Sequence, residues 1–424
     1  MARLWLTFGV LTPLLAVFVA QRTSLAENYW PWFLATHPDS ARASEQQLGG
    51  TDHGPDLTQE LGHVSSPPII AHHASEIQGD LPEDAFVRRI VAVGDLHGDF
   101  GNARKVLEMS GVANKEGKWI GGVDFFVQTG DIIDRGDDTI ELFSYMDKLR
   151  DQALAVGGMV LSHLGNHEWM NVIGIYVYPS EIKTFGSIEA RVKMITTGQI
   201  GKSWAANYTT TSRLPLHPSL GPPNTDYDPS ISSPISHSAL SFVHGGLAPT
   251  YLDLTPYPSK INEISSSLLR KLQTREFPPV HPPNPYPGLP KTATNDERGL
   301  YGGDGPLWYR GWALDQDEGV EGGLCDRADS VMEKIGVRRL IVGHTPDFEK
   351  IVSRCGGKVI IIDTGISHAY GGVLSALSIT YSLTPLPPSG DGEKRWKERE
   401  TVVAVYPDGQ DLLADDVREI TGNL

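Results

Sequence analysis

Val91-Ala92-Val93-Gly94-Asp95-Leu96-His97-Gly98-Asp99 contains a pattern that later parts of the chain repeat. It begins with an apolar run that ends at Gly94. Within the next five residues come a carboxylate, an imidazole and a second carboxylate, at Asp95, His97 and Asp99. Carboxylate oxygens and imidazole nitrogens are common ligands of metal ions in proteins. The stretch therefore predicts a β-strand that leads directly into a metal-binding loop.

The same design recurs four times further along the chain, each time as an apolar run that ends in a turn with ligand-type side chains. The four stretches are FFVQTGDIIDR (125–135), MVLSHLGNHE (159–168), SFVHGGL (241–247) and LIVGHT (340–345). Short apolar runs that alternate with helical stretches indicate β-α units around a buried sheet. In such sheets sites form in the loops beyond the carboxyl ends of the strands. Side chains that are distant in the sequence are therefore expected to meet at one edge.

Periodicity predicts the individual elements of this α/β chain. Strands are expected at 86–93, 125–128, 159–164, 240–243, 338–342, 358–362, 373–379 and 401–406, and helices at 102–110, 139–155, 188–195 and 261–272. The alternation of strands and helices stops at 169–239 and at 259–304. In the second of these segments, seven prolines between Pro278 and Pro290 forbid a regular element. We interpret both segments as insertions over the mouth of the site. An alternative interpretation of the proline-rich part is a ligand for SH3-type domains.

The net charge limits the possible binding partners, and the cysteine count limits the possible disulfides. The formal net charge of -16 argues against binding to nucleic acid or to an anionic membrane surface, because both require clustered Lys and Arg. A phosphate-handling protein of this charge needs local cations, which bound metal ions would supply. Cys325 and Cys355 are too few for a disulfide framework, and they either form one bridge or remain two free thiols.

The amino terminus has the pattern of a targeting segment. Met1-Ala2-Arg3 precedes a 17-residue apolar run, 4–20, and the small residues of Ser24-Leu25-Ala26 fit a signal-peptidase site. We expect a cleaved secretory signal, with an uncleaved membrane anchor or an organellar leader as alternatives. A membrane association is expected only if the segment is not cleaved. The sequon at Asn207 agrees with a secretory route.

Taken together, the motifs GDLHGD, GDIIDRG, GNHE, VHGGL and GHT resemble those of the calcineurin-like metallophosphoesterases. The sequence context of GHT, and ISHAYGG (366–372) in the place of SAPNYC, are more similar to the Shewanella-like protein phosphatases than to the eukaryotic serine/threonine phosphatases. The resemblance implies an α/β fold with a β-sandwich flanked by helices and cap insertions. It assigns 1–26 to the signal or anchor, 27–85 to a linker, 86–384 to the catalytic domain and 385–424 to an exposed loop with a C-terminal strand.

The resemblance also implies a centre for two metal ions. Asp95, His97 and Asp131 match the ligands of the first ion, and Asp131, Asn166, His244 and His344 match those of the second. The mixed ligand set suits Mn, Fe or Zn. Two such ions neutralise phosphoryl oxygens and supply a hydroxide for in-line attack on a phosphate ester.

Four further residues are expected to take part in the reaction. His167 directly follows Asn166, so a turn that points the amide at a metal leaves the imidazole facing the substrate. In the family this histidine protonates the departing oxygen, and Asp134 orients it. Arg135 and Arg310 match phosphate-binding arginines, whose forked guanidinium suits bidentate contacts.

Other polar residues are interpreted as structural or as neighbours of the site. Tyr370 is a candidate for the rim of the pocket, and Asp99 is expected to support the first loop by hydrogen bonds. The residues considered packed, solvated or outside any motif are His72, His73, His163, His217, His237, His281, Asp363 and His368.

These expectations combine into a phosphomonoesterase that acts on phosphoprotein or on a small phosphate ester. Insertions that deepen the pocket would favour phosphotyrosine over the shorter phosphoserine. The alternatives are a dinucleoside polyphosphate hydrolase and a catalytically silent metal-binding protein.

Overall fold

The structure is a computed structural model of the 424-residue chain. It describes residues 84–175, 184–276, 288–388, 390 and 392–424. The predictions for 1–83, with His72 and His73, and the prediction for His281 lie outside the described residues. None of the helices in the described ranges is long and apolar enough to cross a membrane.

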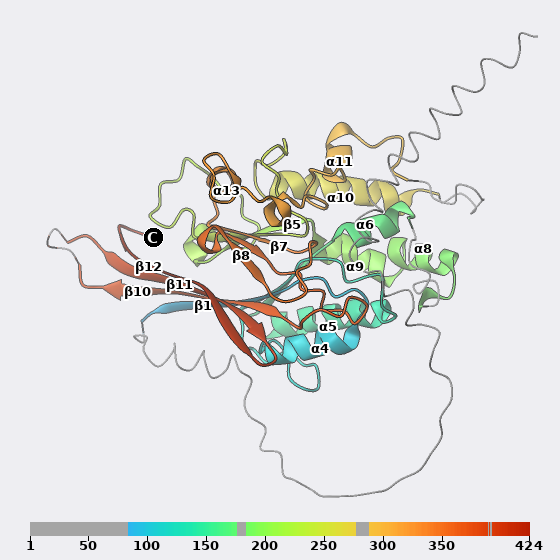
Figure 1. The fold of residues 1–424 in the computed structure, drawn as a ribbon, viewed down its shortest axis with the longest axis horizontal. Coiled ribbons are helices and arrows are strands. Elements are labelled where there is room, and N and C mark those ends of the chain that lie inside the picture. The colour runs from blue at the N-terminus through green and yellow to red at the C-terminus, as the bar shows by residue number, and fades with distance from the viewer. Residues whose placement is uncertain (1–83, 176–183, 277–287, 389, 391) are drawn as a thin grey trace, which may run out of the picture. The chain divides into compact units, whose positions relative to one another are not determined.

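Two β-sheets form the centre of the domain (Figure 1). The first has the order β12-β11-β10-β1-β2-β3-β4, with β1 Phe86–Val93, β2 Phe125–Gln128, β3 Met159–His163, β4 Tyr208–Thr209, β10 Ala376–Leu386, β11 Arg395–Tyr406 and β12 Gly409–Thr421. The second has the order β5-β6-β7-β9-β8, with β5 Thr211–Pro215, β6 Ala239–Val243, β7 Arg339–Val342, β8 Val352–Arg354 and β9 Val359–Ile361. The predicted α/β architecture of two sheets flanked by helices is confirmed.

Parallel strands form one end of the first sheet and the middle of the second, and they determine where the motif loops lie. β1, β2, β3 and β4 run parallel, as do β6, β7 and β9. Their carboxyl ends therefore open on the same edge of each sheet. The motifs GDLHGD, GDIIDRG, GNHE, VHGGL and GHT each begin within three residues of the end of one of these strands.

Alternating side chains of β1 divide the apolar core into two parts. Ile90 and Ala92 belong to the cluster between the sheets, which also contains Phe242 of β6 and Ile341 of β7. Val91 and Val93 belong to the cluster that contains the apolar residues of the helices. A strand that is buried on both faces reads as a continuous apolar run. This is why the sequence of β1 ends in IVAV rather than in an alternating pattern.

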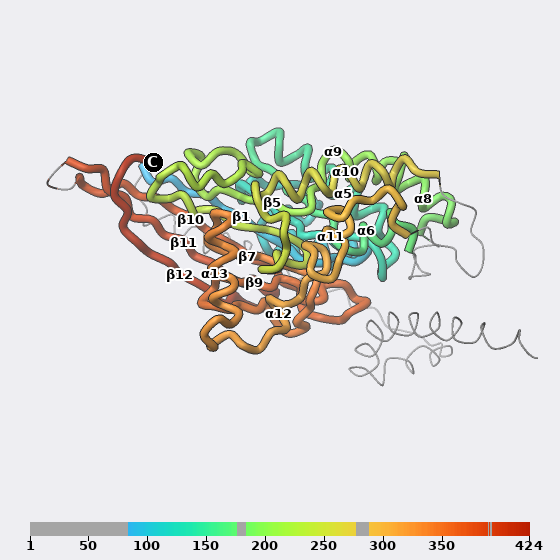
Figure 2. Tube along the Cα trace, turned by 90° about the horizontal axis from the view of Figure 1, so that it is seen from above, coloured from blue at the N-terminus to red at the C-terminus, as the bar shows by residue number. Residues whose placement is uncertain are grey.

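Helices cover the outer faces of both sheets. In Figure 1, α4 (Phe100–Met109) and α5 (Thr139–Ala155) lie on one side, and α10 (Ser259–Thr274), α11 (Asn295–Leu300) and α13 (Leu324–Ile335) lie on the other. Figure 2 shows α6 (Asn166–Ile173), α8 (Ile188–Thr196) and α9 (Gln199–Asn207) beside α10. Both ends of α5 coincide with the prediction, because its apolar residues recur at helical spacing.

The segment 169–239 differs from the predicted insertion. It contributes β4 to the edge of the first sheet and β5 to the edge of the second, in addition to α8 and α9. β4 has two residues and β5 is rich in Thr, Ser and Arg, so neither carries an apolar periodicity. Their pairing with β3 and β6 supplies the stabilisation that local sequence does not indicate.

The carboxyl-terminal region also differs from the predicted exposed loop and single edge strand. β10 continues to Leu386, β11 begins at Arg395, and the edge strand is β12 rather than β11. Glu398 and Glu400 are buried in β11, where Arg338 contacts both carboxylates at 2.8 and 3.0 Å. Buried charges are tolerated when they are paired. The pairing depends on a residue 60 positions away, so local sequence could not reveal it.

Candidate metal centre

Six ligand-type residues converge at the carboxyl ends of the parallel strands. The loop after β1 carries Asp95 and His97, the loop after β2 carries Asp131, the start of α6 carries Asn166, and the loops after β6 and β7 carry His244 and His344. All six are buried. The two sheets thus bring together residues separated by 249 positions in the chain, since the His344 amide donates to Asp95 Oδ1 at 3.3 Å.

Asp131 is the common neighbour of these residues. Its Oδ2 atom lies 3.3 Å from His244 Nε2 and 3.7 Å from His97 Nε2. His244 Nε2 also lies 2.8 Å from Asn166 Oδ1. The ligand atoms of Asp131, His244 and His344 lie within 4.8 Å of one another, as do those of Asp131, His97 and His167. Asp131 is therefore shared by two groups of donors, which is the arrangement required of a bridging ligand.

Hydrogen bonds fix which nitrogen of each ring faces the centre. His97 Nδ1 donates to the Ile133 carbonyl at 3.0 Å, and His244 Nδ1 donates to the Thr129 carbonyl at 3.1 Å. Each bond leaves Nε2 with its lone pair free for a ligand. Within the described residues the buried Nε2 of His344 has no hydrogen-bond partner. A buried polar atom without a partner is costly unless a ligand satisfies it.

The electrostatics of the centre call for cations. Burial, together with the neighbouring carboxylates of Asp363 and Asp131, raises the pKa of Asp95 well above its usual value. Burial and the charge of His167 lower the pKa of His97 to about 3, so its imidazole is neutral at physiological pH. Burial also lowers the pKa of His344 well below its ordinary value. Neutral imidazoles among crowded carboxylates form a set that a positive ion would stabilise.

The backbone at this centre adopts conformations that most residues avoid. His97, Asp131, Asp134, Arg135 and His344 all have positive φ, with values from 40° to 75°. Such conformations cost on the order of 1–3 kcal/mol each and persist only where surrounding contacts hold them. The described residues contain two other non-glycine positions with positive φ, so these conformations are concentrated at the centre.

Two motif glycines are required because the loops approach each other closely. A Cβ atom at Gly165 would lie 2.2 Å from Asp131 Oδ1, and one at Gly343 would lie 2.7 Å from Asp95 Oδ1. Any side chain at these positions would push a carboxylate out of the centre. The glycines of GNHE and GHT therefore follow from packing, not only from turn geometry.

The residues present fit a pair of metal ions. They combine carboxylate, amide and imidazole donors, an imidazole nitrogen left without a partner, and a carboxylate common to two donor groups. The cations would also offset the repulsion between Asp95, Asp131 and Asp363. Donor chemistry alone is compatible with Mn, Fe or Zn.

His167, a member of one donor group, also forms a pair with Asp134. His167 Nδ1 donates to Asp134 Oδ2 at 2.7 Å, and His167 Nε2 lies 3.8 Å from Asp131 Oδ2. Burial opposes protonation of His167, but the Asp131 and Asp134 carboxylates raise its pKa above the ordinary value. Burial alone would raise the pKa of Asp134, whereas the His167 bond and the Arg191 charge hold it below its usual range. In this pair the protonated form of the His167 imidazole is therefore favoured.

Both predicted arginines and the predicted tyrosine border the centre. The Arg135 guanidinium lies over the Tyr370 ring, 4.4 Å from its centroid. Arg310 Nη1 donates to the His344 carbonyl at 2.8 Å and to Thr345 Oγ1 at 3.1 Å. Tyr370 in turn lies 5.3 Å from the His97 ring, between ring centroids. These side chains are partly exposed, so solvent reaches them beside the buried ligands.

Sequence analysis missed four residues that contact the centre. Asp363 was interpreted as structural, although its charge raises the pKa of Asp95 and it follows an apolar run of the same design as the other motifs. The carboxylate of Glu168 accepts the backbone N–H groups of the Asp131 loop. Asn171 and Arg191 both donate to Asp134. Asn171 lies one helical turn after His167, which is a detectable signal, whereas Arg191 has no sequence signal.

Unlike Asp363, four other residues interpreted as structural make the contacts of supporting residues, namely His163, Asp99, His217 and His237. His163 is buried and lies 2.9 Å from Ser212 Oγ through Nε2. Asp99 caps α4 by accepting from the Asn102 amide and also accepts from His368 Nδ1 at 2.8 Å. His217 and His237 contact Ser219 and Ser236, away from the motif loops.

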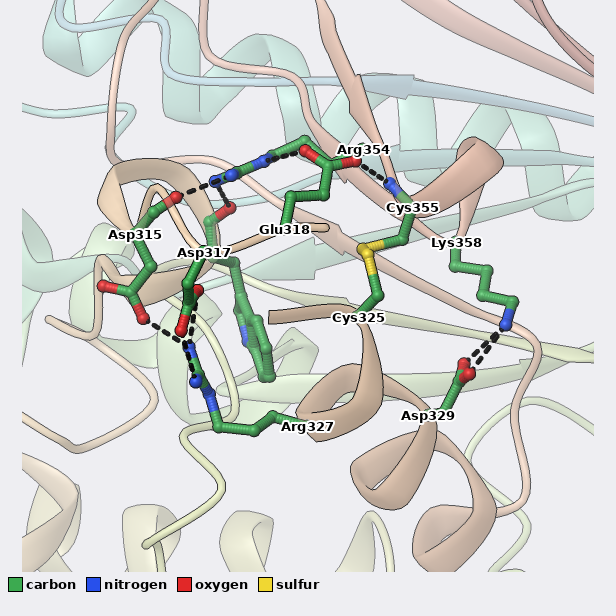
Figure 3. Close-up of a disulfide and its surroundings, with 10 residues drawn as sticks. Asp315, Asp317, Glu318, Cys325, Arg327, Asp329, Arg354, Cys355 and Lys358 are labelled. Atoms are coloured by element: carbon green, nitrogen blue, oxygen red, sulfur yellow. Dashed lines mark hydrogen bonds and ion pairs between the residues drawn. A yellow bond between two sulfur atoms is a disulfide. The ribbon is translucent and has the colours of Figure 1, made fainter. Parts of the chain in front are cut away.

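Cys325 and Cys355 form a disulfide, which resolves the question that the sequence left open. It joins the start of α13 to the residue after β8 (Figure 3). Next to it, Arg354 Nη1 donates to the Trp312 carbonyl at 2.9 Å. Trp312 lies in α12 (Gly311–Leu314), which begins directly after Arg310. Arg354, next to the bridge, thus tethers the segment that carries a predicted phosphate-binding arginine.

Several known proteins are similar to this chain in sequence or in fold. The calcineurin-like phosphoesterase family matches residues 88–348. An uncharacterized protein of Schizosaccharomyces pombe is 33% identical over 305 residues, 70% of this chain and 78% of that protein. Shewanella-like protein phosphatase 2 of Arabidopsis thaliana is 25% identical over 315 residues, 66% of this chain and 71% of that protein. The crystal structure of the cold-active protein-tyrosine phosphatase of a psychrophilic Shewanella species has a TM-score of 0.52 at 20% identity, covering 77% of this chain and 81% of that one.

Because the family match spans more than half of the sequence, the chain belongs to the calcineurin-like phosphoesterase family. It is accordingly an enzyme, a phosphoesterase that hydrolyses phosphate esters, and the predicted family resemblance is confirmed. The crystal structure supports the fold alone, since its sequence identity is low.

Proposed function

We propose that this chain is a dinuclear-metal phosphomonoesterase that acts on phosphorylated side chains of proteins. The single observation that carries the proposal is the position of Asp131, whose Oδ2 lies 3.7 Å from His97 Nε2 and 3.3 Å from His244 Nε2, next to the hydrogen-bonded pair of His167 and Asp134. Protein phosphatases among the curated relatives support a phosphoprotein substrate.

In this proposal Asp95, His97 and Asp131 hold one metal ion, and Asp131, Asn166, His244 and His344 hold the other. When bound, the two ions supply neutralisation of the phosphoryl oxygens and a low pKa for coordinated water. The protein holds these ligands in one orientation through the backbone carbonyls of Ile133 and Thr129, which accept from His97 and His244.

His167 serves as the general acid in this proposal. Its Nδ1 is committed to Asp134, so the proton for the departing ester oxygen would leave from Nε2. The pKa of His167 is raised by the Asp131 and Asp134 carboxylates against the effect of burial, and this favours the protonated form. A positioned acid of this kind typically contributes about 10²- to 10⁴-fold to the rate.

Arg135 and Arg310 would orient the phosphoryl group from two sides. The Arg310 guanidinium is already held by the His344 carbonyl and Thr345, so only part of its fork remains for a substrate. Arg135 lies over Tyr370 and carries its positive charge beside His97 and His167. Guanidinium groups held by other contacts lose less entropy when they bind a phosphate.

Aromatic side chains next to the ligand histidines favour an aryl phosphate such as phosphotyrosine. Tyr370 lies 5.3 Å from the ring of His97, and Trp308 lies 5.6 Å from the ring of His344, both between centroids. The two aromatic residues thus contact different members of the ligand set. The flat ring of an aryl ester bound beside them would gain apolar and edge-to-face contacts that a phosphoserine side chain lacks.

A substrate panel tests the proposal. Protein from Glu27 onward, loaded separately with Mn, Fe or Zn, is assayed on matched peptides that contain phosphotyrosine, phosphoserine or phosphothreonine and on a dinucleoside polyphosphate. We expect turnover of the peptides, with the highest kcat/KM for phosphotyrosine. Equal or better turnover of phosphoserine would refute the aryl preference. Turnover of the dinucleotide alone, or metal binding without any turnover, would replace the proposal by one of the two alternatives.

We further propose that the chain enters the secretory pathway through residues 1–26. The Cys325–Cys355 disulfide supports this, since disulfides persist mainly in oxidising compartments. Asn207, the residue of the sequon, is exposed. Mass spectrometry of the amino terminus of the mature protein tests the proposal, and retention of Met1 in a soluble cytosolic fraction would refute it.

A further inference from the structure

Arg191 is a fully buried arginine that reaches the centre from outside every motif. It lies on α8, in the segment 169–239, and its side chain is 0% exposed. Its Nη2 atom donates to Asp134 Oδ1 at 2.6 Å. A guanidinium is rarely buried unless it is held by a carboxylate or by other acceptors. Its partner here is the aspartate that also receives the hydrogen bond of His167.

The two carboxylate oxygens of Asp134 accept hydrogen bonds from different donors. Oδ2 accepts from His167 Nδ1 at 2.7 Å and from Asn171 Nδ2 at 2.9 Å. Oδ1 accepts from Arg191. A carboxylate that is held through only one oxygen can rotate about its Cβ–Cγ bond. The contact from Arg191 fixes the plane of the carboxylate and hence the direction in which the His167 ring points.

The backbone at this position also needs to be held. Asp134 and the adjacent Arg135 have φ values of 72° and 75°, which non-glycine residues rarely adopt. Local contacts to the peptide groups are modest, with the Gly136 amide donating to the Asp134 carbonyl at 3.0 Å. A charge-assisted hydrogen bond to the Asp134 side chain supplies a stronger restraint. The same restraint positions Arg135, which follows directly in the chain.

We propose that Arg191 is a positioning residue for the acid step, acting through Asp134 on His167. The inference rests on the proposed function, because it assumes that His167 protonates the leaving oxygen. It also changes the role of the segment 169–239. The segment supplies strands to both sheets and, in addition, holds the proton donor in place.

The test compares two esters that differ in how much they need an acid. Phenyl phosphate releases a basic phenolate, whereas p-nitrophenyl phosphate releases a weakly basic one. Arg191→Met should lower kcat by about 10- to 100-fold on phenyl phosphate and by less than about threefold on p-nitrophenyl phosphate, as expected for partial loss of a general acid. Arg191→Lys keeps the positive charge and should restore most of the loss.

Arg339→Met is the matched control. Arg339 is 2% exposed and donates to Glu400 Oε1 at 2.9 Å, at the start of β7 and therefore at the end of the strand opposite to His344. Like Arg191→Met, the Arg339→Met substitution removes a buried ion pair, so the two variants should affect folding similarly. We expect it to leave the ratio of the two kcat values unchanged. An equal ratio for Arg191→Met and Arg339→Met would overturn the inference.

A double-mutant cycle separates positioning from general stability. In a His167→Asn background the acid is absent, so Arg191→Met should cause no further change in the ratio of the two esters. If Arg191→Met changes that ratio by the same factor with and without His167, the residue does not act through His167 and the inference fails.

A spectroscopic measurement keeps the inference testable if neither ester is turned over. The imidazole Nδ1 proton of His167 in its bond to Asp134 should give a downfield proton resonance, assigned by its loss in His167→Asn. Arg191→Met should shift this resonance or speed its exchange with water, and Arg339→Met should not. Absence of turnover in the wild type would refute the proposed function. An unchanged resonance in Arg191→Met would refute the role of Arg191.

Discussion

Glu168→Gln is the substitution for which the structure gives the most direct magnitude. Glu168 is fully buried and follows Asn166 and His167 at the start of α6. Its Oε2 accepts the backbone N–H groups of Asp131 at 2.9 Å and Gly165 at 2.7 Å. Its Oε1 accepts those of Ile132 at 2.8 Å and Ile133 at 3.2 Å. One carboxylate therefore shapes the loop that carries the bridging ligand.

The amide of glutamine can accept at only one end. Its oxygen can keep one pair of N–H donors, while its NH₂ group faces the other pair, so two buried donors lose their acceptor. Each unsatisfied buried donor costs about 1–3 kcal/mol, which gives about 2–6 kcal/mol for Glu168→Gln. Asp131 has a φ of 53°, and the loss of two restraints would let this strained residue relax away from the centre. We expect metal affinity to fall by about 10- to 100-fold, as for other residues that support metal ligands.

Two measurements check this prediction. Urea unfolding of the metal-free protein gives the change in the free energy of unfolding, and elemental analysis after dialysis against graded chelator gives the metal affinity. Glu297→Gln is the matched control. Glu297 is also a buried glutamate in the first turn of a helix, but its carboxylate accepts from Thr294, Ser267 and Lys271 instead of from the metal loops.

The control should lose stability and keep its metal. If Glu168→Gln retained two metal ions per chain with wild-type affinity, the Asp131 loop would not depend on this carboxylate and the reasoning would be wrong. If both variants lost metal equally, the effect would be one of general stability.

Three further predictions concern the reaction and the stability of the fold. His167→Asn should lower kcat by about 10²- to 10⁴-fold with metals still bound, and by less on p-nitrophenyl phosphate than on phenyl phosphate; equal losses on the two esters would exclude the acid role. Asp131→Asn should abolish activity and reduce metal content, and a variant with two ions per chain by elemental analysis would contradict its bridging position. Burial alone would raise the pKa of Glu398, but its bonds from Arg418 and the charge of Arg338 lower that pKa to about 2. A carboxylate whose pKa is lowered in the folded state stabilises the fold above its unfolded pKa of about 4.3 and loses this effect as the pH falls toward 2, so about 3 kcal/mol should disappear over that range. Urea unfolding of the metal-free wild type and of Glu398→Gln at several pH values measures this loss of stability. If the difference in the free energy of unfolding between the two proteins stayed constant down to pH 2, the lowered pKa of Glu398 would be refuted.

Apolar runs and their ends could be read from the sequence because both follow from local chemistry. β1, β2 and α5 have the predicted bounds, since burial on both faces requires continuous apolar residues and burial of one helical face requires a period of 3.6. Glycine next to a ligand-type residue marked the ends of β1, β2, β3, β6 and β7. The six candidate metal ligands were therefore identifiable without a structure.

Elements that depend on distant partners could not be read in this way. β12 has the sequence GQDLLADDVREIT, in which acidic residues occupy much of the strand, and it is ordered by its long pairing with β11. β4 and β5 are short and polar, and they exist because a sheet edge is available to them. For such strands the stabilising hydrogen bonds come from the partner, so their own residues carry little signal.

The candidate metal ligands, their order after the strands and the family resemblance could all be read from the residues alone. The Cys325–Cys355 bridge, the position of Asp363 beside Asp95 and the contact of Arg191 with Asp134 became visible only in the folded chain. The two groups of features differ in the range of the interactions that produce them. Strand ends, turns and capping glycines are set by neighbours within a few residues. A disulfide, a pair of carboxylates or a buried ion pair depends on a separation in space that the spacing of residues in the sequence does not encode.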